Sequence, residues 1–183
     1  LIPDKFGSEG MLRQRGRFFC TPPDRPVRCQ LYAAGFNFCF ASVLQDCPYD
    51  PSLHHLFFGE EVSMAVRLYT AGYDMYAPCQ SVCYHLWSRT HRPADYATFV
   101  STNNNTSNDE RKKKAQREQS LAVVLEQVAG RGPGLSDQRT ATAWAAELGL
   151  HVAELTVRFR APECVVRTED EGSAYFAPNE WEA

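Results

Sequence analysis

The chain has 183 residues, of which 44% are hydrophobic and 22% are charged, and its net charge is −3 at neutral pH. These values describe a globular chain with enough apolar residues for one core, and no apolar run reaches the ~20 residues that a membrane helix needs. The weak negative charge argues against a nucleic-acid partner, because such binding depends on clustered Lys and Arg. The 7 cysteines, irregularly spaced and mostly among apolar neighbours, predict reduced, buried thiols and a cytoplasmic protein.

The first forty or so residues show no helical periodicity. Residues 1–30, which include the turn-forming run Thr21-Pro22-Pro23-Asp24-Arg25-Pro26, are predicted to form a long loop or an ordered arm. In the next segment, Phe36, Phe38 and Phe40 alternate and predict a strand over Leu31 to Phe40 with one buried face. Gly35 allows the close approach of a neighbouring backbone or of a ligand. Because neither an initiator Met nor a signal peptide is present, we expect a piece of a longer protein.

The next segment has the spacing of a helix. Apolar residues recur there at positions i, i+3, i+4 and i+7, namely at Val62, Ala65, Val66 and Tyr69. Gly72 follows as a C-terminal stop. Glu60 and Glu61 are therefore expected in the first turn of this helix or just before it.

Two short strands are predicted beyond this helix, Tyr73 to Ala77 and Val82 to Trp87, with a turn at Pro78 between them. A strand places alternate residues on one face, so His85 and Trp87 share a face of the second strand. Histidine is a metal ligand as well as a frequent core residue, so this face is a candidate site.

The C-terminal part is predicted to be mostly helical. Residues 101–108 are polar and low in complexity, as in a loop or linker. Ser107 and Glu110 form a capping box that opens a helix. The apolar stripe of this helix consists of Leu121, Val124, Leu125 and Val128. A further helix with the stripe Ala141, Trp144, Ala145 and Leu148 ends at Gly149, and a strand is expected over Leu155 to Phe159.

The carboxylates and the histidine each have a structural explanation when considered separately. Carboxylates at a helix start complement the helix dipole and contribute about 0.3–1 kcal/mol each. A lone histidine on a strand can be a hydrogen-bonded core residue. The order of the elements favours a shared pocket instead, because a Gly-Glu-Glu turn, an amphipathic helix, a short strand and a His-containing strand can bring both groups together.

The segment from Leu31 to Pro93 resembles a GlcNAc-transferase family typified by the cytoplasmic enzyme that modifies hydroxyproline of an F-box ubiquitin-ligase adaptor. The matching motifs are Ala33-Ala34-Gly35-Phe36, Pro48-Tyr49-Asp50-Pro51, Leu56-Phe57-Phe58-Gly59-Glu60-Glu61, Gly72-Tyr73-Asp74 and Tyr84-His85-Leu86-Trp87-Ser88-Arg89. More distantly, their order is similar to that in polypeptide N-acetylgalactosaminyltransferases. The resemblance implies an α/β fold: residues 1–100 would be the C-terminal half of a GT-A-like catalytic domain with a mixed sheet, 101–108 a linker, and 109–183 a helical extension.

The resemblance also implies an activity and a set of site residues. The reaction would be metal-dependent transfer of GlcNAc from the donor UDP-GlcNAc to a hydroxyl of a protein acceptor, hydroxyproline or Ser/Thr, with retention of configuration. His85 would bind Mn²⁺ or Mg²⁺ at the donor diphosphate. Glu60 and Glu61 would be catalytic, by hydrogen bonding to sugar hydroxyls or by stabilising an oxocarbenium ion, without a distinction between them. The expected donor-binding residues are Gly35, Gly59, Trp87, Arg89 and His91.

One element of such enzymes is missing from the sequence. They hold the metal and the ribose with an Asp-x-Asp motif on an earlier strand, and no Asp-x-Asp occurs here. Asp46 and Asp50 have the wrong spacing for it. We therefore expect the chain to start downstream of that motif and to be inactive in isolation.

Two other classes of protein fit parts of the sequence. In a carbohydrate- or protein-binding domain without a metal, Trp87, Tyr73 and Tyr76 would stack on the ligand. A nucleic-acid binder would depend on the basic run of residues 111–114 and on Arg117, but charges at this spacing are more typical of the solvated face of a helix. We expect no contact of this segment with a membrane.

Overall fold

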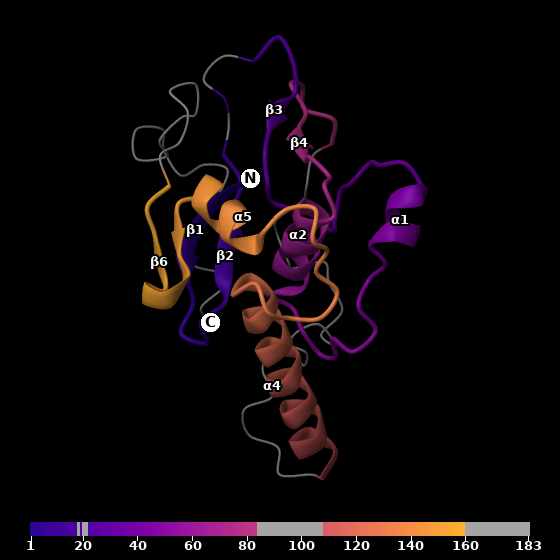
Figure 1. The fold of residues 1–183 in the computed structure, drawn as a ribbon, viewed down its shortest axis with the longest axis vertical. Helices are drawn as coiled ribbons and strands as arrows, with labels where there is room; N and C mark the ends of the chain where they lie inside the picture. Colours follow the sequence, from indigo (N-terminus) through magenta and orange to yellow (C-terminus); the bar gives the residue numbers. More distant parts are fainter. Residues whose placement is uncertain (18, 20–21, 84–107, 160–183) are drawn as a thin grey trace, which may run out of the picture.

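The structure, a computed structural model, describes residues 1–17, 19, 22–83 and 108–159. Within these ranges the chain combines helices with three separate two-stranded antiparallel sheets. Figure 1 shows helix α2 near the centre, with strands β1 and β2 to one side of it and the long helix α4 below. The predicted combination of helices and strands is confirmed. Among the helices of the described ranges, none has the length and apolar character to cross a membrane.

The N-terminal region is a hairpin and not a loop. Strand β1 (Ile2–Phe6) pairs with β2 (Leu12–Arg15), and Gly10 adopts a φ of 78° in the turn between them. Met11 and Leu12 are buried in the core. The prediction of a loop or arm over residues 1–30 was wrong, because burial and pairing stabilise strands that are too short to show a periodicity of their own.

A second sheet joins two distant segments. Strand β3 (Val27–Arg28) pairs with β4 (Tyr76–Ala77), so the predicted strand over Tyr73 to Ala77 is confirmed in its last two residues. Val82 and Cys83 lie outside any strand, and the remainder of the second predicted strand lies outside the described residues.

The aromatic segment between these strands was predicted wrongly. Residues 31–40 form no strand, and the side chains of Phe36, Phe38 and Phe40 are 50%, 99% and 86% exposed. The alternation would bury these rings only if another layer covered them, and none of the described elements does so. The short helix α1 (Ser42–Asp46), which follows, also has no buried residue.

Helix α2 (Glu60–Thr70) is the predicted central helix, and Gly72 follows it with a φ of 88°. Every residue from Val62 to Thr70 is buried, so the helix is enclosed on all sides and not only along the predicted apolar stripe. A helix buried all round lies at the centre of a core.

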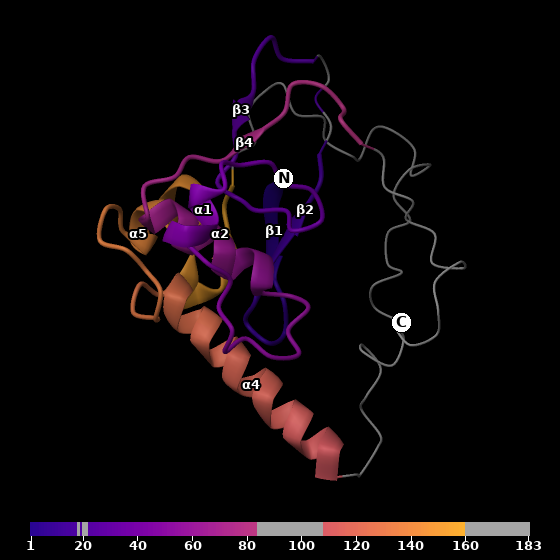
Figure 2. The same ribbon diagram turned by 90° about the vertical axis from the view of Figure 1, so that its right-hand side faces the viewer.

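Helices α4 (Asn108–Val128) and α5 (Ala141–Glu147) pack against α2, as the sequence predicted for their apolar stripes. Val124 and Val128 of α4 are buried, as is Trp144 of α5. Figure 2 shows that the N-terminal half of α4 extends away from the other elements. Asn108, the last residue of the predicted linker, is already helical. Residues on both sides of that linker thus contribute to one hydrophobic core.

The described chain ends in a small hairpin. Strand β5 (Leu150–His151) leads through the 3-10 helix η1 (Val152–Glu154) to β6 (Thr156–Val157), within the strand predicted over Leu155 to Phe159. Figure 1 shows β6 beside β1, and the two strands are in contact.

The cysteines differ in their surroundings. All five that the structure describes are free thiols, and Cys47 is buried, as predicted. Cys39 and Cys83 are exposed, so the prediction of burial was wrong for them. Cys39 lies in the uncovered aromatic segment, where apolar neighbours in sequence do not produce burial.

Candidate active site

The start of α2 places the two predicted carboxylates side by side. Glu60 and Glu61 occupy the first turn, where the helix dipole favours negative charge. Gly59 precedes them with a φ of 116°, a conformation that favours glycine. A Cβ atom at Gly59 would lie 3.0 Å from the Sδ atom of Met11. The missing side chain at this position therefore makes room for the N-terminal hairpin.

Each oxygen of the Glu61 carboxylate accepts a hydrogen bond. Its Oε2 atom accepts from Nε2 of Gln14 at 2.6 Å, and its Oε1 atom accepts from the backbone N–H of Ala34 at 2.9 Å. The same Gln14 nitrogen donates to the carbonyl of Tyr32 at 2.7 Å. Glu61 thus connects α2 to strand β2 and to the loop after residue 32.

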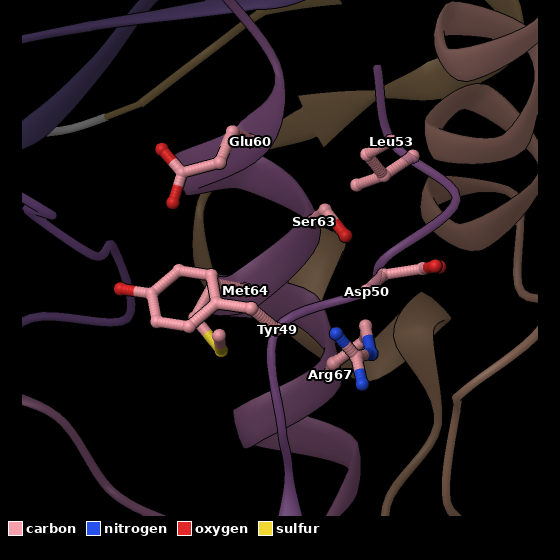
Figure 3. Close-up of a pocket in the computed structure, with 7 residues that line it drawn as sticks. All are labelled: Tyr49, Asp50, Leu53, Glu60, Ser63, Met64 and Arg67. Carbon is pink, nitrogen blue, oxygen red and sulfur yellow. The ribbon is translucent and has the colours of Figure 1, made fainter. Parts of the chain in front are cut away.

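Glu60 faces a pocket instead. The pocket has a volume of about 210 Å³ and is shown in Figure 3. Its lining consists of Tyr49, Asp50, Leu53, Glu60, Ser63, Met64 and Arg67. Burial, and then the charge of Glu61, raise the pKa of Glu60 above its ordinary value. Two adjacent carboxylates therefore have different environments, and only one of them faces an open space.

Two hydroxyl groups of the pocket wall are held by neighbouring side chains. The hydroxyl of Tyr49 lies 2.7 Å from that of Tyr32, which also accepts from Nδ2 of Asn37 at 2.6 Å. Burial raises the pKa of Tyr32. Ser63 donates to Oε1 of Gln127 on α4 at 2.7 Å. The loop before α2 and α2 itself therefore line the pocket, and α4 holds one of its hydroxyl groups through Gln127.

Arg67 and Asp50 complete the pocket. The side chain of Arg67 is buried, with 6% of the residue exposed, and its Nε atom donates to the carbonyl of Gly134 at 3.3 Å. Asp50 accepts from the N–H and the hydroxyl of Ser52 at 2.9 and 2.7 Å. Burial opposes ionisation of Asp50, but these hydrogen bonds and the charge of Arg67 outweigh it and lower its pKa. Asp50 is thus ionised at neutral pH.

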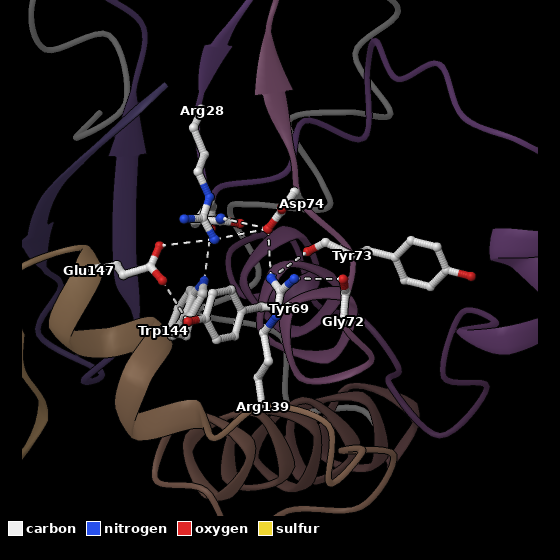
Figure 4. Close-up of polar contacts among 9 residues, drawn as sticks. Arg28, Tyr69, Gly72, Tyr73, Asp74, Arg139, Trp144 and Glu147 are labelled. Carbon is white, nitrogen blue, oxygen red and sulfur yellow. Dashed lines mark hydrogen bonds and ion pairs between the residues drawn. The ribbon is translucent and has the colours of Figure 1, made fainter.

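A second polar cluster lies at the other end of α2 and is shown in Figure 4. Oδ1 of Asp74 lies 2.9 Å from Nη2 of Arg28 and 2.6 Å from Nη1 of Arg139. Arg139 also donates to the carbonyl of Gly72 at 2.8 Å. The nearby Trp144 donates from its indole N–H to the carbonyl of Gln30 at 2.8 Å. Asp74, which belongs to one of the matching motifs, has a structural function here.

The structure brings together part of the predicted site. Glu60 and Glu61 share a turn with Gly59 before them. Gly35 lies in the exposed loop, next to the residue whose N–H binds Glu61, and a Cβ added to it would meet no atom within 4 Å. The other predicted site residues, His85, Trp87, Arg89 and His91, lie outside the described residues. Within the described ranges no group of three or more His, Cys, Asp or Glu side chains could hold a metal ion.

Sequence reasoning missed the pocket residues Asp50 and Arg67. A signal for Arg67 was present, because Glu60, Ser63 and Arg67 recur at positions i, i+3 and i+7, which share one face of a helix. We used the helical spacing only to identify the apolar stripe, and we did not consider the polar residues that recur at similar intervals. Asp50 was named only within the matching motif Pro48-Tyr49-Asp50-Pro51 and as a residue with the wrong spacing for an Asp-x-Asp motif.

Comparison with known proteins identifies the family. A family model described as Glycosyltransferase (GlcNAc) matches residues 1–153. No curated protein and no solved structure matches the chain. The matched range includes the hairpin, the pocket and helices α2, α4 and α5, and it covers most of the sequence. The chain therefore belongs to the GlcNAc glycosyltransferase family.

Proposed function

We propose that this chain is part of an enzyme that transfers GlcNAc from UDP-GlcNAc to a hydroxyl of a protein, hydroxyproline or Ser/Thr. Family membership supports glycosyl transfer in general. The observation that carries the proposal is that Glu60 lines a pocket at the start of α2 while both oxygens of Glu61 accept hydrogen bonds from other parts of the chain. Ligand pockets typically combine an apolar lining with a few polar groups that orient the ligand, and a carboxylate can accept hydrogen bonds from sugar hydroxyls.

The two carboxylates then have different functions. Glu60 is the catalytic residue that contacts the sugar, by accepting a hydroxyl hydrogen bond or by stabilising positive charge at the anomeric carbon. Glu61 is a positioning residue, because its two oxygens hold Gln14 and Ala34. Gly59 belongs to the same turn, and the loop with Gly35 is held in place through Ala34.

The donor diphosphate requires more positive charge than this pocket offers, because Arg67 shares the lining with the carboxyl groups of Asp50 and Glu60. We propose His85 as a ligand of Mn²⁺ or Mg²⁺, since imidazole is a suitable ligand for Mn²⁺. Such a cation, when bound, neutralises charge on the leaving diphosphate. Trp87, Arg89 and His91 follow His85 closely in sequence and are proposed to contact the donor. A GT-A arrangement of the sheet is part of the same proposal.

The proposal is tested on the full-length protein that carries this chain. The assay measures transfer of labelled GlcNAc from UDP-GlcNAc to a hydroxyproline- or Ser-containing polypeptide, with and without Mn²⁺. We expect Glu60→Gln to lower the catalytic rate by about 10²-fold or more with little change in donor affinity. His85→Ala should weaken Mn²⁺-dependent UDP binding. Absence of transfer with any acceptor, together with UDP binding that does not depend on Mn²⁺, would exclude the proposal.

A further inference from the structure

The guanidinium of Arg67 is the unusual group in the pocket beside Glu60. Arg67 is 6% exposed, yet its one hydrogen bond within the described ranges is the 3.3 Å contact from Nε to the carbonyl of Gly134. Its two terminal nitrogens have no hydrogen-bond or ion-pair partner among those residues. Neither of these nitrogens is among the buried side-chain atoms without a partner, so both remain accessible within the pocket that Arg67 lines. A hydrogen-bond acceptor on a ligand can therefore pair with them.

The charges around Arg67 restrict what that acceptor can be. The carboxylates of Asp50 and Glu60 line the same pocket, and neither forms an ion pair with Arg67 within the described part of the chain. In Figure 3 the Glu60 carboxylate and the Tyr49 hydroxyl point to one side of the pocket, while Arg67 lies below Asp50 at the other. Two carboxylates repel an anion such as a diphosphate, and the guanidinium repels a metal cation. A neutral ligand that both donates and accepts hydrogen bonds matches all three groups.

Size and apolar surface restrict the ligand further. A volume of about 210 Å³ is below the roughly 300–1,000 Å³ of pockets that hold drug-sized molecules. One sugar ring fits such a space, and a whole nucleotide sugar does not. Leu53 and Met64 give the lining an apolar portion next to its polar groups.

We infer that this pocket is a monosaccharide subsite in which Arg67 binds the carbonyl oxygen of an acetamido group while Glu60 and Asp50 accept from hydroxyls. An amide carbonyl is a good acceptor for the planar donors of a guanidinium, and the apolar portion can take the acetamido methyl group. The inference deepens the proposed function and rests on it for the choice of sugar. It assigns to Arg67 the discrimination of an N-acetylated sugar from one without the acetamido group, and to Asp50 and Glu60 the binding of hydroxyl groups.

The test uses free monosaccharides and this chain, so it does not depend on transferase activity. Saturation-transfer NMR with N-acetylglucosamine should give its strongest signal at the acetamido methyl. We expect N-acetylglucosamine to bind about tenfold more tightly than glucose, because glucose leaves the Arg67 donors unpaired. Arg67→Lys keeps the positive charge but replaces the planar pair of guanidinium donors with a single ammonium group. This variant should lose the preference for N-acetylglucosamine without binding glucose more weakly.

A second variant covers the case in which the buried Arg67→Lys protein does not fold, as judged by circular dichroism. Asp50→Asn keeps an oxygen for the Ser52 hydrogen bonds and should weaken both sugars about tenfold. The matched control is Arg131→Lys, at an exposed arginine that pairs with Glu126 away from the pocket, which should change neither affinity.

The outcomes separate this inference from the proposed function. Equal binding of both sugars, binding of neither, or affinities that do not respond to Arg67→Lys or Asp50→Asn would overturn the subsite. If the full-length protein nevertheless transfers GlcNAc, the subsite fails and the proposed function stands. If the sugar preference is found but no transfer occurs, the subsite stands and the proposed function fails.

Discussion

Glu61 and Gln14, 47 positions apart in the sequence, are joined by a hydrogen bond of 2.6 Å from Nε2 of Gln14 to Oε2 of Glu61. The other oxygen of Glu61 accepts from the backbone of Ala34. This arrangement separates Glu61 from its neighbour Glu60, which lines a pocket. Two identical side chains in one helical turn therefore have different surroundings because of what the rest of the chain places against them.

The contacts of Glu61 predict a loss of stability on its removal. Glu61→Ala leaves two donors without their acceptor, and we expect a loss of about 1–3 kcal/mol in the free energy of unfolding. For a chain of this size each kcal/mol corresponds to about 2–4 °C in Tm. Glu60→Ala is the matched control and should lower the free energy of unfolding less, because Glu60 does not connect α2 to Gln14 and Ala34 as Glu61 does. Thermal denaturation followed by circular dichroism measures both, and equal losses would contradict this assignment.

The environment of Glu60 predicts a pH dependence of stability. Burial and the charge of Glu61 raise its folded-state pKa above the ordinary value of 4.5. The folded state thus holds the proton more tightly than the unfolded chain, so Glu60 contributes less stability as the pH rises from 4.5 through the folded pKa.

The measurement for Glu60 is urea denaturation between about pH 4 and 8. Glu60→Gln, which does not titrate, should become more stable relative to the natural chain as the pH rises through this window. Glu118→Gln, at an exposed position of α4, is the control for the replacement of a carboxylate by an amide. A stability difference for Glu60→Gln that does not change with pH would show that its carboxyl is not destabilised by burial.

The glycines before α2 predict contrasting effects of the same substitution. Gly59→Ala introduces a Cβ at a φ of 116° and only 3.0 Å from Met11, so we expect a loss of about 1–3 kcal/mol. Gly35→Ala adds a methyl group where nothing lies within 4 Å, and stability should be nearly unchanged. Chemical denaturation compares the two variants. A loss at Gly35 as large as that at Gly59 would mean that its surroundings are not as the structure describes them.

Because of the burial and the hydrogen bond of Trp144, we expect the C-terminal helices and α2 to unfold together. It has 0% exposure and donates to the carbonyl of Gln30, in the N-terminal part of the chain. Trp144→Ala should cost about 3–5 kcal/mol, and Trp144→Phe about 1–3 kcal/mol because the Gln30 carbonyl loses its donor. Hydrogen exchange should then show faster opening of α2 as well as of α5, with exposed Val82→Ala as a control without effect. Faster exchange confined to α5 would indicate separate folding units.

We expect Asp74 to stabilise the fold by an amount that depends on pH and on ionic strength. The hydrogen bond from Arg139 and the nearby guanidinium groups lower the pKa of Asp74, so its contribution is present at neutral pH and is lost as the pH falls through the folded pKa. Because these side chains are partly exposed, we expect Asp74→Asn to cost only about 0.5–1 kcal/mol at low ionic strength.

The test of Asp74 compares Tm at low and high salt. The loss on Asp74→Asn should shrink at high ionic strength, since screening weakens exposed ion pairs. Asp137→Asn is the control, at an exposed aspartate near Arg139 in sequence. A loss that does not respond to salt would assign the contribution of Asp74 to neutral hydrogen bonding.

The helices and the position of the carboxylate pair could be predicted from local patterns in the sequence. The stripe of Val62, Ala65, Val66 and Tyr69 with Gly72 behind it predicted α2, and the stripe around Trp144 predicted α5. Helical periodicity is a local property, and a stripe of apolar residues at this spacing has one efficient way to be buried. The same periodicity placed Glu60 and Glu61 in the first turn.

Which of the two carboxylates lines the pocket, and which other residues line it, depends on contacts between distant parts of the chain. The hydrogen bonds that engage Glu61 come from Gln14 and Ala34, in a hairpin and a loop that have no periodicity to reveal them. The exposure of Phe38 likewise depends on which layers cover the loop and not on its alternating pattern. Local patterns specify elements, whereas the pairing of distant segments, such as β3 with β4, depends on contacts that form only when the whole core is assembled.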